Sequence, residues 1–318
     1  FSFTISSFLT GCFKIGQADL IICESPPLFL GFTAVLLKYI KGARLIFNVS
    51  DLWPESAVKL GIVTNPWLIR LSTWLELWIY RHSDKISGQT QGIVADIQKR
   101  MPDKSVFWLR NGVDPEDIDR RISEKDWRKD KGFEPADFLV YFGGLLGYAQ
   151  GLEVMLEAAQ HTVQYPHIKY VLVGDGPEKD KLLRLKQEWG LEQVFFFPGV
   201  TRMEIIDVIH CMDVAVIPLR KVDLFLGAIP SKIFEILYLK KPVLLGIEGE
   251  AKDLFIDQAQ AGLFYEPENG AALAEAVLKM SEQPDFVGAM GDRGREFVLR
   301  HFNRRQIAGD FWEFAAQV

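Results

Sequence analysis

The stretch FLVYFGGLLGYAQGLEVMLEAA, residues 138–159, decides the fold class of this 318-residue chain. It begins with a short run of apolar residues, continues into a glycine-bearing loop and ends in a segment with helical spacing of apolar side chains. A strand that is apolar on both faces is typical of a parallel sheet covered by helices on both sides. The stretch therefore predicts a strand–loop–helix unit of a doubly wound α/β domain.

The same rhythm continues along the chain in both directions. After this stretch, apolar runs that indicate strands occupy residues 170–177, 194–200, 214–219 and 242–247. Before it, strands are expected within 18–27, 43–54, 84–90 and 104–114, with helices at 28–40, 66–83 and 91–101. The charged segment 114–137 lacks an apolar stripe and indicates a linker with at most a small helix. We therefore expect two doubly wound units that are joined near residues 110–115.

Composition excludes several classes of protein. A hydrophobic content of 48% supports a sizeable core, and a net charge of −6 argues against a nucleic-acid-binding surface. Cys12, Cys23 and Cys211 have neither paired nor metal-type spacing, which favours a reducing cytoplasm. The chain starts at Phe1 without the features of a signal peptide, and its apolar runs are too short to cross a bilayer. We expect a soluble cytoplasmic chain whose true N-terminus is missing.

Glycine-bearing loops follow several of the expected strands. Ligands of such sheets bind beyond the carboxyl ends of the strands, where glycines let the backbone approach an anion. The pair Gly143 and Gly144 and the sequence VGDGP, residues 173–177, lie at these ends. A tight turn of any α/β protein explains each loop equally well. The loop that contains Gly143 has the spacing of neither a Walker nor a dinucleotide motif, and VGDGP alone is an equally weak signal.

A second candidate is GAIPSKIFEILYLKKPVLL, residues 227–245. Pro230 and Ser231 suit the start of a helix, which places Lys232 and Glu235 three residues apart on one face. A lysine there would bind an incoming anion, and a carboxylate one turn later would accept hydrogen bonds from sugar hydroxyls. The alternative is a Lys–Glu surface pair of little energetic value. We favour binding because the segment follows a strand end.

Taken in order, these motifs resemble a known family. The segments GLLGYAQGLEVMLEAA, VLVGDGPEKDKL, VFFFPGVTRMEIIDVIHCMDVAVIPL, PSKIFEILYLKKPVLL and AGLFYEPENGAALAEAV resemble the C-terminal domain of retaining GT-B glycosyltransferases of family 4. NVSDLWPESAVKLGI and RNGVD resemble the N-terminal domain and hinge of the same family. The similarity is greatest to the branch that makes bacterial surface polysaccharides, including O-antigen, capsule and fucosamine transferases. The ordered set covers nearly the whole chain.

The resemblance implies two Rossmann-like domains facing a cleft. Residues 1–112 would form an incomplete acceptor-side domain, 113–297 the nucleotide-sugar domain, and 298–318 a helix that crosses back to the first domain. The reaction would move a sugar from a nucleoside diphosphate, most commonly UDP, to a glycan or polyprenyl-diphosphate-linked acceptor with retention. The resemblance also implies that Glu235 holds the donor ribose and that Lys232 and Ser231 lie near the diphosphate and ribose. The other residues expected to bind the donor are Gly143, Gly144, Gln150, Gly174, Asp175, Gly176, Val200 and Arg220.

The chain departs from the family pattern at several positions. Leu145 and Gln150 replace an arginine and a lysine that many relatives carry in the glycine loop. Gly227 replaces a glutamate, and Ser50, followed by Asp51, replaces a histidine beside the acceptor. With fewer cations in the loop, Lys232 becomes the main positive charge expected at the leaving group.

Chemistry of this kind needs positive charge at the departing diphosphate rather than a pair of flanking carboxylates. Lys232, with Arg220 and Arg110, would supply that charge, so neither a metal nor another cofactor is expected. Asp117 and Asp119 form a DxD pair, but their charged context indicates a solvated segment. Asp51 ends a strand of the first domain and is the candidate to orient or deprotonate the acceptor hydroxyl, unless it makes a local turn.

Two further questions stay open at the sequence level. Trp67, Leu71, Trp74 and Trp78 form one helical stripe that indicates core packing, the alternative being contact with the inner face of a membrane that carries the acceptor. The alternatives to a transferase are a nucleotide-sugar 2-epimerase of the same fold and a non-catalytic remnant that binds a sugar nucleotide.

Overall fold

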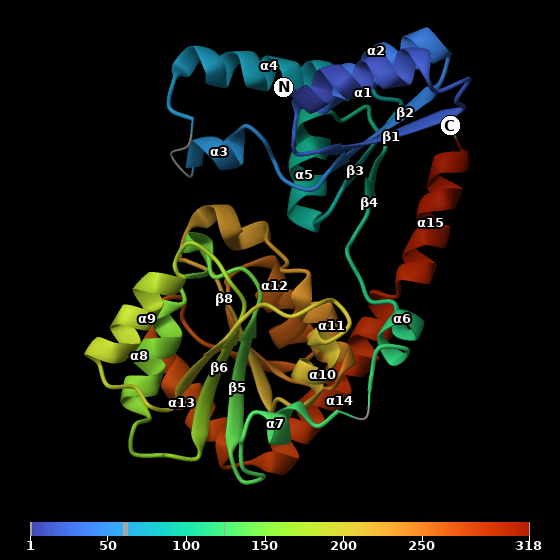
Figure 1. The fold of residues 1–318 in the computed structure, drawn as a ribbon. Helices are drawn as coiled ribbons and strands as arrows, with labels where there is room; N and C mark the ends of the chain where they lie inside the picture. Colours follow the sequence, from blue (N-terminus) through green and yellow to red (C-terminus); the bar gives the residue numbers. More distant parts are fainter. Residues whose placement is uncertain (1, 60–62, 124, 318) are drawn as a thin grey trace. The chain divides into compact units, whose positions relative to one another are not determined.

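The computed structural model describes residues 2–59, 63–123 and 125–317, and the chain divides into two compact units. The first unit comprises residues up to Asn111 together with Arg305–Val318, and the second comprises Gly112–Arg304. Residues 60–62, the end of the NVSDLWPESAVKLGI motif, and Phe1 lie outside the described residues. Each unit contains a parallel sheet with helices on it, which confirms the doubly wound α/β class (Figure 1).

The first unit contains a parallel sheet in the order β1-β2-β3-β4. Its strands are β1 (Leu20–Ser25), β2 (Arg44–Val49), β3 (Lys85–Gly88) and β4 (Val106–Trp108). Its helices are α1 (Ser2–Phe13), α2 (Phe29–Lys41), α3 (Glu55–Lys59), α4 (Pro66–His82), α5 (Gln91–Arg100) and α15 (Arg304–Ala316). Helices α2, α4 and α5 bury their apolar residues in one cluster against β2 and β3.

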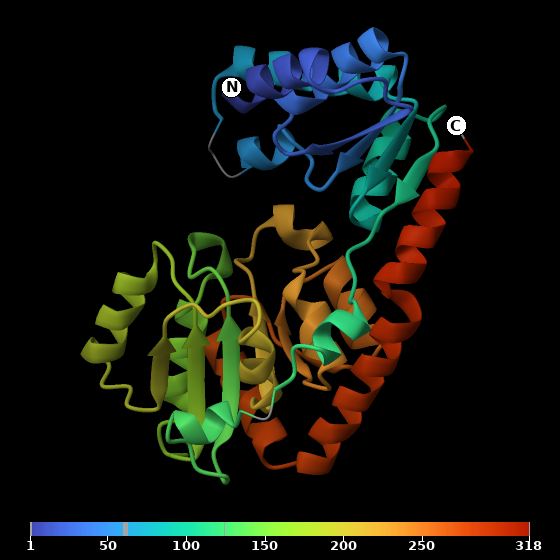
Figure 2. The same ribbon diagram turned by 45° about the vertical axis from the view of Figure 1, so that its right-hand side comes forward.

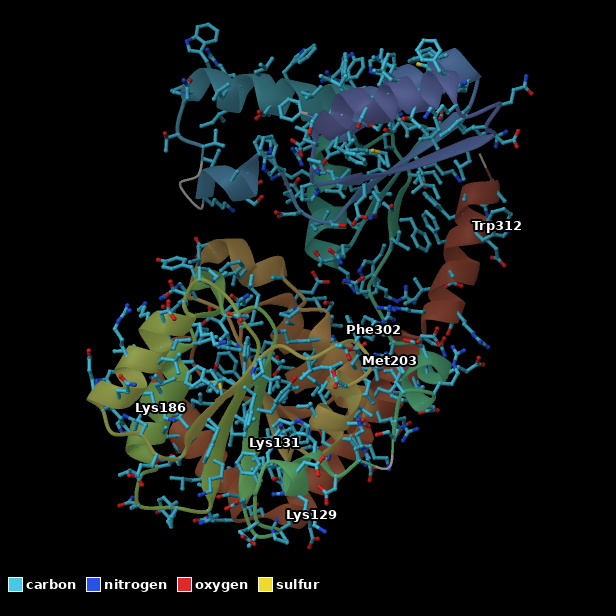
Figure 3. The ribbon with its side chains drawn as sticks, viewed as in Figure 1. Lys129, Lys131, Lys186, Met203, Phe302 and Trp312 are labelled. Carbon is cyan, nitrogen blue, oxygen red and sulfur yellow. The ribbon has the colours of Figure 1, made fainter. Side chains whose placement is uncertain are left out.

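Helix α15 packs against β4 of this sheet (Figure 2). The rings of Phe311 and Phe314 lie 5.6 and 5.0 Å from the ring of Phe107. Trp312 points away from this contact and is exposed (Figure 3). The C-terminal segment therefore belongs to the first unit although it follows the second unit in sequence.

The tryptophan stripe of α4 does not enter the core. Trp67 is 78% exposed, and Leu71 and Trp74 are also exposed, while Trp78 is half-buried. The buried face of α4 is instead Ser72, Leu75, Glu76, Ile79 and Tyr80. The core-packing interpretation is therefore wrong for Trp67, Leu71 and Trp74, because an adjacent face of the helix, with one buried Glu–Arg pair, meets the sheet. Trp78 does pack against the core cluster.

The second unit contains a six-stranded parallel sheet in the order β10-β9-β8-β5-β6-β7. The strands are β5 (Phe138–Gly143), β6 (Ile168–Val173), β7 (Val194–Phe197), β8 (Val214–Pro218), β9 (Val243–Gly246) and β10 (Gly262–Phe264). The sequence did not single out β10, which has only three residues. The strand order reverses between β5 and β8, which is where ligands of such sheets bind.

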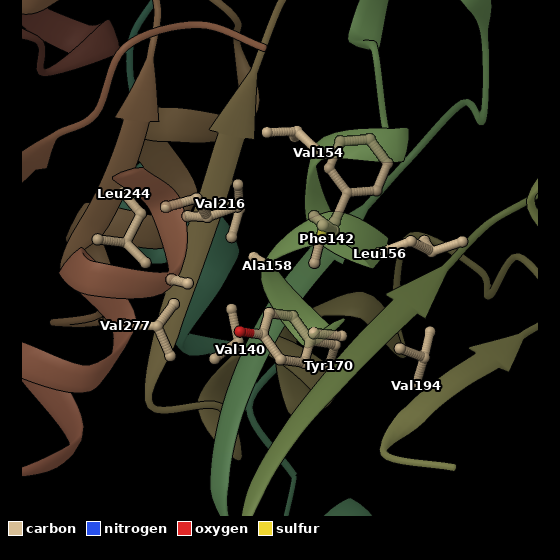
Figure 4. Close-up of a cluster of buried hydrophobic side chains, with 14 of the residues drawn as sticks. Val140, Phe142, Val154, Leu156, Ala158, Tyr170, Val194, Val216, Leu244 and Val277 are labelled. Atoms are coloured by element: carbon tan, nitrogen blue, oxygen red, sulfur yellow. The ribbon is translucent and has the colours of Figure 1, made fainter. Parts of the chain in front are cut away.

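Helices cover both faces of this sheet. The short elements before β5 are α6 (Pro115–Asp119) and α7 (Trp127–Asp130), and the helices after it are η1 (Tyr148–Gln150), α8 (Glu153–His161), α9 (Lys179–Glu188), α10 (Ile205–His210), η2 (Asp223–Gly227), α11 (Lys232–Tyr238), α12 (Glu250–Lys252), η3 (Asp253–Gln258), α13 (Gly270–Ser281) and α14 (Pro284–His301). On one face, α8 and α13 pack on Val140, Phe142 and Tyr170 (Figure 4). On the other, Phe234, Phe255 and Phe302 form an aromatic cluster.

Two sequence-based assignments differ from the structure. Residues 292–318 were expected to form one terminal helix, but the structure has two helices that are separated at Phe302 and Asn303. The ring of Phe302 is buried, and Val113 forms backbone hydrogen bonds with Phe302 and Arg304, the residues on both sides of Asn303. Residue 298, taken as the start of that helix, lies inside α14. The segment 114–137 is not a free linker either, since Ile118, Arg121 and Phe133 are buried.

Candidate functional site

A pocket of about 430 Å³ opens at the carboxyl ends of β5, β6 and β7 in the second unit. Its walls also include α10 and the first turn of α11, and Figure 1 shows both helices beside the ends of these strands. The lining residues are Tyr141, Gly143, Gly144, Leu145, Val173, Gly174, Asp175, Gly199, Val200, Thr201, Arg202, Ile205, Ile209, Lys232, Glu235 and Ile236. The pocket thus lies at the carboxyl ends of the strands, where ligands of such sheets bind, and includes the end of β5, one of the two strands at which the order reverses.

Two glycine loops form part of this pocket by direct contact of their backbones. Gly174 has a φ of +159°, and a Cβ on it would fall on the carbonyl oxygen of Gly144. The N–H groups of Gly144 and Leu146 donate to the carbonyl oxygens of Val173 and Asp175 at 2.9 and 2.8 Å. These two amides are therefore already bonded, and the glycine at 174 permits the close approach of the two loops.

Lys232 extends from the first turn of α11 into the pocket. Its Nζ donates to the carbonyl oxygen of Gly143 at 2.8 Å and lies 4.1 Å from the centre of the Phe142 ring. Burial lowers the pKa of Lys232 from 10.5 to about 8. In the described part of the chain no carboxylate forms an ion pair with it. A buried cation without a counter-charge is destabilising, and an anionic ligand would supply that charge.

Glu235 lies on the same face of α11, one turn further along. Its side chain is 31% exposed, and its Oε1 lies 3.4 Å from Nη2 of Arg121. The hydroxyl of Tyr141 is buried nearby, and burial together with the charge of Glu235 raises the pKa of that tyrosine. The helical spacing therefore places a cation and a carboxylate in one pocket, as the sequence indicated.

Arg202 and Arg121 were not identified from the sequence. Arg202 lines the pocket, is 71% exposed and pairs with Asp117 at 2.9 Å. Arg121 is buried behind the pocket wall, where it also pairs with Asp117. Arg202 lies two residues after Val200 in the loop that follows β7, and this position at a strand end is the sequence feature that could have identified it as a pocket residue. Arg121 lies in a charged segment whose contacts are distant in sequence.

The structure brings seven of the predicted donor-binding residues to the pocket, namely Gly143, Gly144, Gly174, Asp175, Val200, Lys232 and Glu235. Gly176, Ser231, Gln150 and Arg220 do not line it. Ser231 is exposed just before α11, and Gly176 donates its N–H to the carboxylate of Asp175. The Oε1 atom of Gln150 is buried, with no hydrogen-bond partner among the described residues.

Arg220 has another environment. Its guanidinium pairs with Glu153 at 3.1 Å and Glu268 at 2.8 Å, and it lies over the ring of Tyr148. Glu153 occupies the first turn of α8, so this helix start is covered by cations and lies outside the pocket. Arg110 is in the first unit, where it lies 3.9 Å from Asp310.

Asp51 belongs to the first unit and follows the carboxyl end of β2. Its neighbour Ser50 donates a hydrogen bond of 2.6 Å to Glu24, near the carboxyl end of β1. Asn48 contacts Ser50 and accepts a hydrogen bond from Ser87. Asp51 therefore lies at a polar edge of the first sheet.

The DxD pair is part of the packing of the second unit, in contrast to the solvated segment that its context suggested. Asp117 is bonded to Arg121 and Arg202, and Asp119 accepts a hydrogen bond of 2.8 Å from Tyr238 of α11. The two carboxylates therefore attach the segment after residue 112 to the pocket. Two arginines beside Asp117 lower its pKa, although part of that carboxylate stays in contact with water.

The fold and this pocket define the class of protein. The chain belongs to the glycosyl transferases group 1 family, whose model matches residues 123–297, more than half of the chain. It is similar to the probable glycosyltransferase WbjE of Pseudomonas aeruginosa, at 25% identity over 276 residues, 84% of this chain and 67% of WbjE. It is also 26% identical over 210 residues to the putative colanic acid biosynthesis glycosyl transferase WcaI of Escherichia coli, covering 62% of this chain and half of WcaI.

Solved structures show the same fold. HepE of Anabaena in complex with UDP-glucose matches with a TM-score of 0.77 at 18% identity, covering 99% of this chain and 82% of HepE. Sucrose-phosphate synthase of Thermosynechococcus elongatus matches with a TM-score of 0.73 at 19% identity, covering 94% of this chain and 73% of that chain. The two units therefore have the GT-B fold.

Proposed function

We propose that this protein is a retaining glycosyltransferase of family 4 that takes its sugar from a UDP-sugar and transfers it to a glycan or lipid-linked acceptor in the cytoplasm, during assembly of a cell-surface polysaccharide. The observation that carries the proposal is the pocket with Lys232 and Glu235. Solved structures of HepE contain UDP or UDP-glucose, and WcaI is named for colanic acid biosynthesis. The family favours transfer over the alternative, 2-epimerisation.

Each end of the donor is assigned to a part of the pocket. Lys232 binds the diphosphate and stabilises the charge that develops on the leaving group. Glu235 accepts hydrogen bonds from the ribose hydroxyls, and the loop at Val200 contacts the base. Lys232 and Arg202 are the basic residues that line the pocket, so they provide the neutralising charge in a reaction without a metal. Asp51 orients the acceptor hydroxyl.

Titration with nucleotides tests this assignment. We expect UDP to bind and Glu235→Ala to weaken UDP binding by about 10-fold, since a hydrogen bond to a charged group is worth about 1.5–3 kcal/mol. Isothermal titration calorimetry with UDP, GDP and ADP measures both the binding and the preference for a base. Glu275→Ala, an exposed glutamate of α13, is the matched control and should leave the affinity unchanged. Equal UDP affinity in Glu235→Ala and wild type would contradict the assignment.

A second proposal concerns the outer face of α1, α2 and α4, which we infer binds an anionic membrane. Exposed apolar side chains gather on these neighbouring helices, among them Phe3, Phe13, Phe32, Trp67 and Trp74. The basic residues of the three helices are Lys38, Lys41, Arg70, Arg81 and His82, and the one acidic residue described there, Glu76, is buried against Arg100. Lys38 pairs with Asp84 at 2.8 Å, whereas Arg70 and Arg81 are exposed. Among the described residues, no helix is both long and apolar enough to cross a bilayer.

The charge of this face supports an anionic lipid surface as its partner. The chain as a whole carries a net charge of −6, whereas the charged residues of these three helices are mostly basic. Aromatic side chains favour the boundary of headgroups and acyl chains, and basic residues are attracted to anionic lipids. Binding there would bring the enzyme to a lipid-linked acceptor.

Vesicle flotation tests the membrane proposal. Wild type should bind mixed phosphatidylcholine–phosphatidylglycerol vesicles, and Trp67→Ala/Trp74→Ala should bind about 100-fold more weakly or worse, because each of the two buried apolar side chains contributes about 1.5–3 kcal/mol. Trp312→Ala, which removes an exposed tryptophan of α15, is the control and should bind like wild type. Absence of wild-type binding to these vesicles would contradict this proposal and leave the donor assignment unaffected.

A further inference from the structure

Arg121 lies behind the pocket and is almost completely buried, with 4% of its side chain exposed. It follows α6, and its Nε donates to the carbonyl oxygen of Asp117 at 3.1 Å. Its Nη2 lies 2.9 Å from the carboxylate of Asp117 and 3.4 Å from that of Glu235. Its Nη1 donates to the carbonyl oxygen of Arg202 at 2.8 Å. One guanidinium therefore joins three segments that are far apart in sequence.

Two of these segments contribute residues to the lining of the pocket. Glu235 comes from α11, and Arg202 comes from the loop after β7 that also contains Val200. The planar guanidinium holds its donors in a fixed fork, so the carbonyl oxygen of Arg202 and the carboxylate of Glu235 are held at a defined spacing. A lysine could supply the charge but not this geometry.

The two carboxylates beside Arg121 lie at different distances from its guanidinium. Asp117 is the closer carboxylate and provides the main counter-charge, whereas Glu235 makes the longer contact. Arg121 contacts Oε1 of Glu235, which leaves Oε2 available for a ligand hydroxyl. The arrangement orients the carboxylate of Glu235 through one oxygen without occupying both.

We propose that Arg121 is the positioning residue for ribose recognition: it fixes the Glu235 carboxylate relative to the base-side loop that contains Arg202. The inference rests on the proposed function, because it takes Glu235 as the ribose acceptor. Arg121 itself does not line the pocket and acts through Glu235 and the backbone of Arg202. It adds a residue of the charged 114–137 segment to the donor site.

Comparison of UDP with 2′,3′-dideoxy-UDP separates this role from a purely structural one. Wild type should prefer UDP by about 10-fold or more, as expected for hydrogen bonds to a charged acceptor. In Arg121→Gln we expect the affinity for UDP to fall towards that for dideoxy-UDP, while dideoxy-UDP binds as to wild type within about twofold. A structural role would weaken both ligands equally, and that result, measured by calorimetry on folded protein, would overturn the proposal.

Controls keep the outcomes distinct. Arg128→Gln removes a half-buried arginine that pairs with Asp213 outside the pocket, so it should leave the ribose preference unchanged. If Arg121→Gln does not fold, Arg121→Lys replaces it: a reduced preference supports the proposal and an unchanged one overturns it. If Glu235→Ala keeps the preference, or wild type binds neither nucleotide, the proposed function itself fails. If Glu235→Ala loses the preference and folded Arg121→Gln keeps it, only the role of Arg121 is overturned.

Discussion

Replacing Lys232 by methionine should make the protein more stable at pH 7 while weakening UDP binding by about 10–100-fold. The pKa of Lys232 is lowered from 10.5 to about 8 by burial, so the folded protein holds this charge at a cost. One pKa unit corresponds to about 1.4 kcal/mol, and after loss of the contact with Gly143 we expect a net gain of about 1–2 kcal/mol. Urea unfolding and calorimetry measure the two effects.

The pH dependence of this gain follows from the direction of the pKa shift. Below pH 8 both folded and unfolded Lys232 are protonated, so the cost of burying the charge is fully present. Between about 8 and 10.5 the unfolded state binds more protons, and the wild type gains stability relative to the variant as the pH rises. Lys279→Met, at an exposed lysine 5.7 Å from the ring centre of Phe286, should change neither stability nor UDP affinity by much. A destabilised Lys232→Met with unchanged UDP affinity would show that the lysine has a structural role.

Gly174→Ala should lower the free energy of unfolding by about 3 kcal/mol and abolish UDP binding. The new methyl group would fall on the carbonyl oxygen of Gly144, so the two glycine loops of the pocket could not keep their contact. The φ of +159° adds strain for any residue with a Cβ. Chemical denaturation and calorimetry measure both changes.

Gly288→Ala provides the matched comparison. Gly288 is an exposed glycine of α14, and a Cβ there would meet nothing within 4 Å. Alanine has the higher helix propensity, so this change should stabilise the protein by about 0.5–1 kcal/mol and leave UDP binding intact. If Gly174→Ala behaved like Gly288→Ala, the close contact of the two loops would not be required.

The fold class could be predicted because a parallel sheet leaves a simple signal. Runs such as FLVYF and YVLV are apolar on both strand faces, and turns separate them from amphipathic segments. That Lys232 and Glu235 share one helix face could also be predicted, since a spacing of three places them there. The strand-end rule then placed both at the ligand edge.

What the sequence did not predict depends on contacts between distant segments. Arg121 is 81 residues from Arg202 and 114 from Glu235 along the chain, so no local pattern connects them. Arg220 follows a strand end like a ligand-binding residue, but Glu153 and Glu268, from distant positions, pair with its charge. The apolar stripe of α4 has helical periodicity whether it faces a core or an external partner, so periodicity alone could not decide its environment.

Calorimetric titration of UDP into wild type and Lys232→Met at pH 7 tests the central claim most directly. The account predicts saturable binding of one UDP to wild type and a loss of about 10–100-fold in the variant, which must be shown to be folded. Failure of folded wild type to bind UDP, GDP or ADP, or equal affinities in wild type and variant, would contradict it.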